Sequence, residues 1–244
     1  MADGDKPVPT EQATGTSDLL VRFISAVAML GLSVIALWLG GWFWIGFVVL
    51  LAGLVLWEWN LLVRGFGVSP LAEVAWQFVG ALYVGAAALA MVQVRINYDM
   101  WTVMLAFLLP VIAVDVGAYF AGRALGGPRI APSISPSKTW AGLLGGALAA
   151  SAITIGIEVS DIAATTAPGY TLAGIGMAGV SGVLIAIIAQ SGDFFESWMK
   201  RRAGVKDSSN LIPGHGGVFD RLDGFIAVFF VLFAIAVVPS YIGM

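Results

Sequence analysis

Long apolar segments are the feature that most restricts the fold of this 244-residue chain. From Phe23 onward, stretches of about 20 apolar residues recur, which is the length that crosses a hydrocarbon core of roughly 30 Å as a helix. Hydrophobic residues make up 59% of the chain and charged residues only 11%, against about 25% charged residues in soluble domains. A soluble globule of this composition would expose large apolar patches and aggregate. The sequence therefore predicts an all-α, polytopic integral membrane protein and argues against a soluble enzyme.

Seven helical spans are expected, within a range of about six to nine. They run over about residues 22–39, 42–62, 72–93, 100–122, 140–158, 171–192 and 224–242. Only Gly40-Gly41 separates the first two, which predicts a tight helical hairpin, and the sixth has the composition to continue as far as Arg202. Residues 1–18 are polar and contain proline, so we expect a disordered cytoplasmic tail. Residues 19–244 then form a single membrane-embedded catalytic domain.

The placement of basic residues predicts the orientation of the chain. With the N-terminus in the cytoplasm, eleven of the 12 Lys and Arg residues fall on the cytoplasmic side, and only Arg95 falls on the other. This bias follows the positive-inside rule. The two long loops on the basic side, at about 123–139 and 193–223, are therefore where we expect the chemistry.

The chain has no Cys and a single His, His215. Disulfides, thiolate metal sites, cysteine nucleophiles and multi-histidine metal centres are therefore excluded. Among the remaining ionisable groups, Asp115 lies within the fourth span, after Pro110, which is expected to kink that helix. A carboxylate at the bilayer centre costs about 2.5–3.5 kcal/mol. Asp115 therefore either pairs with Arg123 or a backbone group, or faces a substrate site.

The loop over residues 122–142 combines three cations with several hydroxyls and a Gly- and Pro-rich backbone. The residues concerned are Arg123, Arg129, Lys138, Ser133, Ser135, Ser137 and Thr139. Such groups donate hydrogen bonds to phosphate oxygens. Residues 136–139 also fit a helix start, with Ser137 or Thr139 as the cap. The alternative is an ordinary positive-inside loop that touches anionic lipid headgroups.

A set of charged residues is predicted on one face of the helix that extends the sixth span. The spacing i, i+3/i+4, i+7 places side chains on one face of a helix. It is found here at Asp193, at Glu196 or Ser197, and at Lys200. The segment that follows is basic and rich in glycine, and Gly214, Gly216 and Gly217 would let backbone N–H groups approach an anion. The alternative is a solvated loop whose acids, such as Asp207, form salt bridges with neighbouring cations.

A second acidic pair, Asp220 and Asp223, begins the last span at i, i+3 spacing. Oxygen-only ligands suit a hard cation such as Mg²⁺, which takes one or two carboxylates and completes its shell with phosphates and water. The two acidic groups bracket the basic loop. The sequence therefore predicts a Mg²⁺-assisted phosphate site at a membrane surface.

This region resembles a known family. The matching residues read Ser197-Trp-Met-Lys200-Arg201, Lys206-Asp207, Pro213-Gly-His215-Gly216-Gly217 and Asp220-Arg221-Leu-Asp223. The pattern is that of the integral-membrane phosphatidate cytidylyltransferases, or CDP-diacylglycerol synthases, and every named position matches over 27 residues. The resemblance covers about residues 110–224. It departs from the family at Ser137, where Lys is usual, and at Ala141, where Glu is usual.

The resemblance implies transfer of CMP from CTP to phosphatidate, giving CDP-diacylglycerol and pyrophosphate. It also implies dependence on Mg²⁺, with a second cation, K⁺ or Mg²⁺, sometimes present. It further implies a homodimer in the inner membrane of a bacterium, with the active site facing the cytoplasm and no nucleic-acid partner.

Roles follow residue by residue. We expect Asp193 and Asp220 to bind the catalytic cation, with Asp223 and Glu196 as nearer or outer ligands. The residues assigned to catalysis are Asp193, Lys200, Asp220 and Asp223. Those assigned to substrate binding are Arg123, Ser135, Lys138, Ser197, Arg201, Lys206, His215, Gly216, Gly217 and Arg221.

Two other functions remain open from the sequence. A CTP-dependent lipid kinase of the polyprenol or phytol type shares membrane embedding and nucleotide use. A transporter would explain the hydrophobicity and Asp115 without chemistry, but its paired broken helices are not evident.

Overall fold

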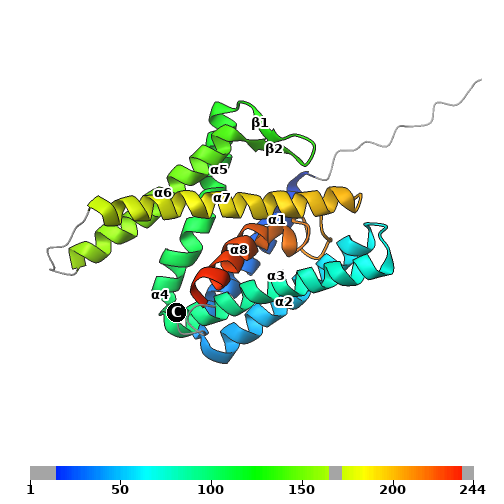
Figure 1. Cartoon of the computed structure of the whole chain (residues 1–244), viewed down its shortest axis with the longest axis horizontal. Coiled ribbons are helices and arrows are strands. Elements are labelled where there is room, and N and C mark those ends of the chain that lie inside the picture. Colours follow the sequence, from blue (N-terminus) through cyan, green and yellow to red (C-terminus); the bar gives the residue numbers. More distant parts are fainter. Residues whose placement is uncertain (1–14, 165–171, 238–244) are drawn as a thin grey trace, which may run out of the picture.

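The computed structural model of the chain describes residues 15–164 and 172–237 (Figure 1). Most of these residues are helical. In chain order the elements are α1 (Gly15–Leu39), α2 (Gly41–Arg64), α3 (Pro70–Asn97), α4 (Met100–Thr102), the π-helical η1 (Val103–Leu108), α5 (Leu109–Leu125), β1 (Arg129–Ala131), β2 (Ser135–Thr139), α6 (Trp140–Ala164), α7 (Leu172–Arg202), α8 (Phe219–Leu232) and the π-helical η2 (Phe233–Val237).

Six helical segments in the described part are long and apolar enough to cross a membrane. They are Leu19–Leu39, Gly41–Arg64, Pro70–Asn97, Met100–Leu125, Trp140–Ser160 and Leu172–Arg202. The chain is therefore a multi-pass membrane protein, as predicted. Helix α7, which forms the predicted sixth span, continues to Arg202, as expected. Helix α8 and η2 occupy the described part of the predicted seventh span, which stays a prediction. Helix α1 begins at Gly15, inside the predicted tail, and residues 1–14 lie outside the described residues.

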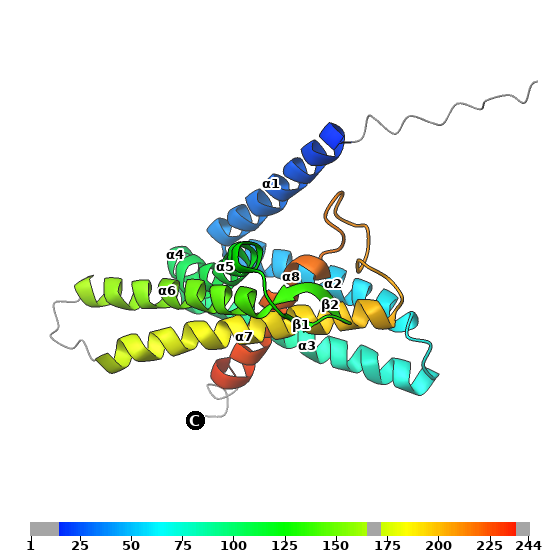
Figure 2. The same ribbon diagram turned by 90° about the horizontal axis from the view of Figure 1, so that it is seen from above.

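The turn between α1 and α2 is made by two glycines. Gly40 and Gly41 have φ angles of 60° and 49°, a left-handed conformation that glycine adopts without a Cβ penalty. The Arg95 side chain fills the space beside this turn, and its Nε donates to the Leu37 carbonyl over 3.0 Å. The predicted break at Gly40-Gly41 is thus confirmed, and it lies beside Arg95, but α1 and α2 do not form a tight hairpin, because α1 diverges from the other helices (Figure 2).

Helices α2, α3 and α8 enclose an aromatic core centred on Trp59. Trp59 is fully buried, and its indole N–H donates to the Trp76 carbonyl over 3.0 Å. A Cβ added to Gly80 would lie 2.5 Å from the Trp59 nitrogen. The missing side chain at Gly80 therefore makes room for the large ring.

Helices α5, α6 and α7 approach one another through small residues instead. A Cβ on Gly145 of α6 would lie 2.7 Å from the Gly117 carbonyl of α5. A Cβ on Gly182 of α7 would lie 2.4 Å from the Ser151 Cα of α6. Small residues let membrane helices come close enough for dense packing. Helix α1, in contrast, stands away from the layer that the other helices form (Figure 2).

A short hairpin is the one addition to the expected helices within the described residues. Strands β1 and β2 pair antiparallel, with Arg129 opposite Thr139 and Ala131 opposite Ser135, and they lie at one end of α5 (Figure 1). Thr139 then begins α6, because its Oγ1 accepts a hydrogen bond from the Gly142 N–H over 3.1 Å. Of the two predicted cap residues, Thr139 takes this role and Ser137 lies in β2.

Candidate active site

A polar cavity of about 740 Å³ lies where α5, β2, α6, α7 and α8 meet. Its wall carries six carboxylates and four cations. The carboxylates are those of Asp115, Asp193, Glu196, Asp207, Asp220 and Asp223, and the cations are Arg123, Lys138, Lys200 and Arg221. The segments that contribute them are far apart in the sequence, so the cavity exists only in the folded chain. It brings the two predicted acidic groups together, and Asp115 faces it as well.

A close contact between α7 and α8 brings their acids together. A Cβ on Gly192 would lie 2.5 Å from the Ala227 Cβ and 2.6 Å from the Asp223 carbonyl. Glycine at this position therefore allows the two helices to approach at the level of Asp193 and Asp223. The i, i+3, i+7 spacing then places Glu196 and Lys200 along the same wall, as predicted.

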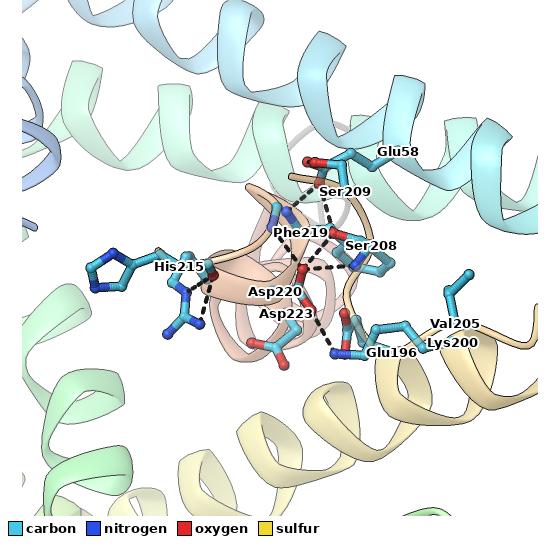
Figure 3. A network of polar contacts seen from close by, with 12 residues as sticks. Glu58, Glu196, Lys200, Val205, Ser208, Ser209, His215, Phe219, Asp220 and Asp223 are labelled. Carbon is cyan, nitrogen blue, oxygen red and sulfur yellow. Dashed lines mark hydrogen bonds and ion pairs between the residues drawn. The ribbon is translucent and has the colours of Figure 1, made fainter. Parts of the chain in front are cut away.

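Lys200 joins two of the carboxylates (Figure 3). Its Nζ lies 2.6 Å from Asp220 Oδ1 and 2.7 Å from Glu196 Oε2. The Glu196 and Asp220 side chains are only 1% and 5% exposed, and that of Lys200 is 13% exposed. Water screens such a cluster poorly, so Lys200 interacts strongly with both acidic side chains.

Asp220 is held on its other oxygen by three donors. Oδ2 accepts from the Ser208 N–H over 2.9 Å, from the Ser208 hydroxyl over 2.7 Å and from the Gly217 N–H over 2.8 Å (Figure 3). Burial alone would raise the pKa of Asp220, but hydrogen bonds with Glu196, Lys200, Ser208 and Gly217 lower it to about 2. Asp220 is therefore a fixed anion at neutral pH.

A second ion pair crosses the cavity from the hairpin to α7. Lys138 of β2 contacts the Asp193 carboxylate. Burial disfavours the charged form of Lys138, but the charge of Asp193 and the hydrogen bond to it raise its pKa overall. Burial and the neighbouring charge of Asp193 raise the pKa of Asp223. A cation bound beside Asp223 would therefore favour its ionised form.

A smaller cavity of about 400 Å³ adjoins the first and shares Asp207 and Arg221 with it. Its wall includes Lys206, His215 and Gly216, three of the predicted binding residues, together with Arg22 of α1. Arg221 holds the backbone of this wall at His215, because its Nε and Nη2 donate to the His215 carbonyl over 3.1 and 2.9 Å.

Four predicted binding residues do not line either cavity. Ser135 and Ser197 are buried. Arg201 is exposed, and its guanidinium lies 3.4 Å from the Ile134 carbonyl. Gly217 contributes through its backbone N–H to Asp220 rather than through contact with the open space. These residues support the walls or the adjoining surface of the cavity.

Comparison with known proteins decides the family. Residues 66–238, more than half of the chain, match the cytidylyltransferase family. The chain belongs to this family. A phosphatidate cytidylyltransferase of Brucella melitensis is 41% identical over 218 residues, which cover 83% of this chain and 77% of that protein. One from Rickettsia bellii is 32% identical over 221 residues, covering 90% and 91%. The predicted family and the nucleotidyltransferase class are thus confirmed.

One residue of the cavity wall and one residue behind it were missed from the sequence. Gln190 of α7 lines the cavity, and its buried amide atoms have no partner among the described residues. Glu58 of α2 lies behind Asp220 and is fully buried. A single carboxylate in the apolar run around Trp59 is a signal that would have found Glu58. Gln190 carries no comparable signal.

The acidic wall fits a metal ion only with help from a substrate. Within residues 15–164 and 172–237, no three Asp, Glu or His side chains lie close enough to hold a metal by themselves. Mg²⁺ in nucleotide enzymes is commonly bound by one or two carboxylates, with phosphates and water completing its shell. Asp193 and Asp223 both line the cavity and would supply such a pair of oxygen ligands.

Proposed function

We propose that this chain transfers CMP from CTP to phosphatidate and releases pyrophosphate, in the cavity between α5, β2, α7 and α8. The observation that carries the proposal is the mixed wall of that cavity, in which four cations alternate with six carboxylates. Cations suit the phosphates of CTP and of the lipid, and carboxylates suit a bridging metal ion. The named relatives are phosphatidate cytidylyltransferases.

In the reaction, an oxygen of the phosphatidate phosphomonoester forms a bond to the α-phosphorus of CTP. The bond from the α-phosphorus to the oxygen that bridges it to the β-phosphate breaks, and pyrophosphate leaves. The attacking phosphate is already an anion, so no Ser or His nucleophile is required. The main barrier is the approach of two polyanions. Arg123, Lys138 and Arg221 on the cavity wall would reduce it by neutralising phosphate charge.

The residues that would hold Mg²⁺ are Asp193 and Asp223, with Asp220 and Glu196 as the other acidic candidates. When bound, Mg²⁺ would supply positive charge for the phosphate oxygens of CTP and of the leaving pyrophosphate. Both oxygens of Asp220 already accept hydrogen bonds or contact Lys200, which favours Asp193 and Asp223 over Asp220 as metal ligands. A second cation, K⁺ or Mg²⁺, belongs to the same proposal.

We place the active site at the cytoplasmic face of a bacterial inner membrane. Eleven of the 12 basic residues support this orientation through the positive-inside rule. The homodimer implied by the family resemblance stays a prediction.

The position of a radioactive label in the product tests the reaction. Purified chain is incubated with Mg²⁺, phosphatidate and CTP labelled with ³²P at either the α- or the γ-phosphate. We expect the α label in the organic phase and the γ label in pyrophosphate. A lipid kinase would transfer the γ label to a lipid alcohol instead. That result, or the absence of any labelled lipid, would refute the proposed function.

Asp193→Asn and Asp220→Asn test the acidic wall in the same assay. Each is expected to lower CMP transfer by about 100-fold or more while leaving expression intact, because each removes charge where phosphates and Mg²⁺ would meet. Glu158→Gln is the matched control, because Glu158 on α6 does not line the cavity. Near-normal transfer by either Asp variant would exclude that residue from the site.

A further inference from the structure

Glu58 is a buried carboxylate that the proposed reaction does not use. It lies in α2 within an apolar span and is 0% exposed. A carboxylate at membrane depth is costly and is retained where it pairs or has a function. Glu58 is stabilised by hydroxyl and backbone N–H donors rather than by an adjacent Lys or Arg in the described structure.

Four polar groups, from the middle of the connection between α7 and α8 and from the start of α8, converge on Glu58 (Figure 3). The Ser209 hydroxyl donates to Oε1 over 2.6 Å, and the Ser208 hydroxyl lies 3.1 Å from Oε2. The backbone N–H groups of Val218 and Phe219 donate over 2.9 and 2.6 Å. One side chain therefore ties the middle of this connection to the first turn of α8.

Glu58 also caps α8 from another helix. The N-cap residue of α8 is Val218, whose own side chain cannot accept a hydrogen bond. The first N–H groups of a helix need an acceptor, and a negative charge there is favourable. The Glu58 carboxylate supplies both at the start of the helix that carries Asp220 and Asp223.

A single hydroxyl separates Glu58 from Asp220. Ser208 Oγ lies 3.1 Å from Glu58 Oε2 and 2.7 Å from Asp220 Oδ2. A Cβ on Gly217 would lie 2.0 Å from this hydroxyl and 2.5 Å from Glu58 Oε1. The space is fully occupied, so a movement of Glu58 displaces Ser208, the 217–219 backbone or both.

We propose that Glu58 is a positioning residue for the proposed CMP transfer, and the inference rests on that function. Glu58 fixes Ser208 and the first turn of α8, and through them it sets the position of Asp220 in the cavity. Because it lies behind Asp220, it would act without touching CTP or the lipid.

Glu58→Gln is the test, because it keeps the shape and replaces one acceptor oxygen by a donor that faces other donors. We expect kcat per folded molecule to fall about 10–100-fold, the range for residues that orient a site from behind, with KM for phosphatidate within about threefold. Amide hydrogen exchange in the peptide containing Val218 and Phe219 should also become faster. Asn60→Ala is the matched control, because it removes a polar contact of α2 with Gln77 over 3.0 Å that does not reach the cavity.

A fall in kcat of less than about tenfold, measured per folded molecule, would overturn the positioning role, because a purely structural residue changes only the folded fraction. If Glu58→Gln cannot be purified as a monodisperse protein, Ser208→Ala replaces it. That variant removes only the hydroxyl between Glu58 and Asp220, and wild-type kcat would overturn the proposal equally. Failure of the proposed function has a different signature, because the wild-type protein itself would then leave the α label in the aqueous phase.

Discussion

Lys200 balances two buried carboxylates, and its removal should have a larger effect than the loss of an ordinary surface cation. It contacts Glu196 and Asp220 at 2.7 and 2.6 Å. In Lys200→Met, those acids lose their shared counter-ion, and removing one partner of a buried ion pair typically costs about 3–5 kcal/mol. We expect a loss of that order in the free energy of unfolding, measured by denaturant titration in detergent, together with loss of CMP transfer.

A second substitution checks the cause of that loss. Combining Lys200→Met with Glu196→Gln removes one of the two buried acids that lose their partner and should recover part of the stability. Lys206→Met is the control for stability alone, since Lys206 is exposed and surface changes usually stay within about 0.5 kcal/mol. Equal stabilities of Lys200→Met and Lys206→Met would contradict the balancing role.

Gly217 tests the packing around Asp220 at the scale of one methyl group. In Gly217→Ala the new Cβ would meet the Ser208 hydroxyl at 2.0 Å and Glu58 at 2.5 Å. The overpacking should lower stability by about 1–3 kcal/mol and reduce CMP transfer. Gly53→Ala in α2 is the control, because nothing lies within 4 Å of its added Cβ. A Gly217→Ala variant with wild-type melting temperature and rate would mean that this contact is not needed.

At the scale of elements, the small-residue packing of α5 against α6 determines where one wall of the cavity lies. Asp115 and Arg123 on α5 face the cavity, and α6 begins beside Lys138. In Gly145→Ala the added Cβ would lie 2.2 Å from the Ala121 Cβ and 2.7 Å from the Gly117 carbonyl. The two helices must then separate.

We therefore expect Gly145→Ala to destabilise the chain by about 1–3 kcal/mol and to weaken CTP use, seen as a lower melting temperature and a higher KM for CTP. Gly156→Ala on the same helix has open space around the added Cβ and should match the wild type. If the two variants behave alike, close contact between α5 and α6 does not position the wall.

The helices themselves were predictable because membrane thickness imposes long apolar runs. The end of α7 at Arg202 followed from the charge spacing after the sixth span. The strand pairing of residues 135–139 did not, since Ser-Pro-Ser-Lys-Thr carries no alternation and pairs only because residues 129–131 lie opposite. A kink near Pro110 stays a prediction; just before Pro110 the structure has the π-helical η1, which was not predicted and whose wider turn lets the Leu109 N–H reach the Met104 carbonyl.

The site shows the same division between local pattern and long-range contact. Helical spacing alone placed Asp193, Glu196 and Lys200 on one wall of the cavity. The partner of Glu58 could not be inferred, because Ser208 is separated from it by 150 residues. Ser197 belongs to the family pattern, yet it is buried beside the wall, since one helix turn carries both a cavity face and a packing face.

At the scale of the whole molecule, two contacts between helix ends lie at opposite ends of α2. Gly40 and Arg95 lie together at one end, and Gly65 lies beside Ala203 at the other. The cavity belongs to the end that contains Ala203. This grouping agrees with the predicted alternation of spans.

The absence of Cys makes the orientation directly measurable. Asn210→Cys and Asn97→Cys each introduce one exposed thiol, on the cavity side and on the Arg95 side respectively. Because positive charge stays in the cytoplasm, a membrane-impermeant maleimide should label Asn97→Cys, but not Asn210→Cys, in cells whose outer membrane has been made permeable. In inverted inner-membrane vesicles the pattern should reverse. Labelling of both positions from one side would contradict the span count, and labelling with the opposite sides would place the active site outside the cytoplasm.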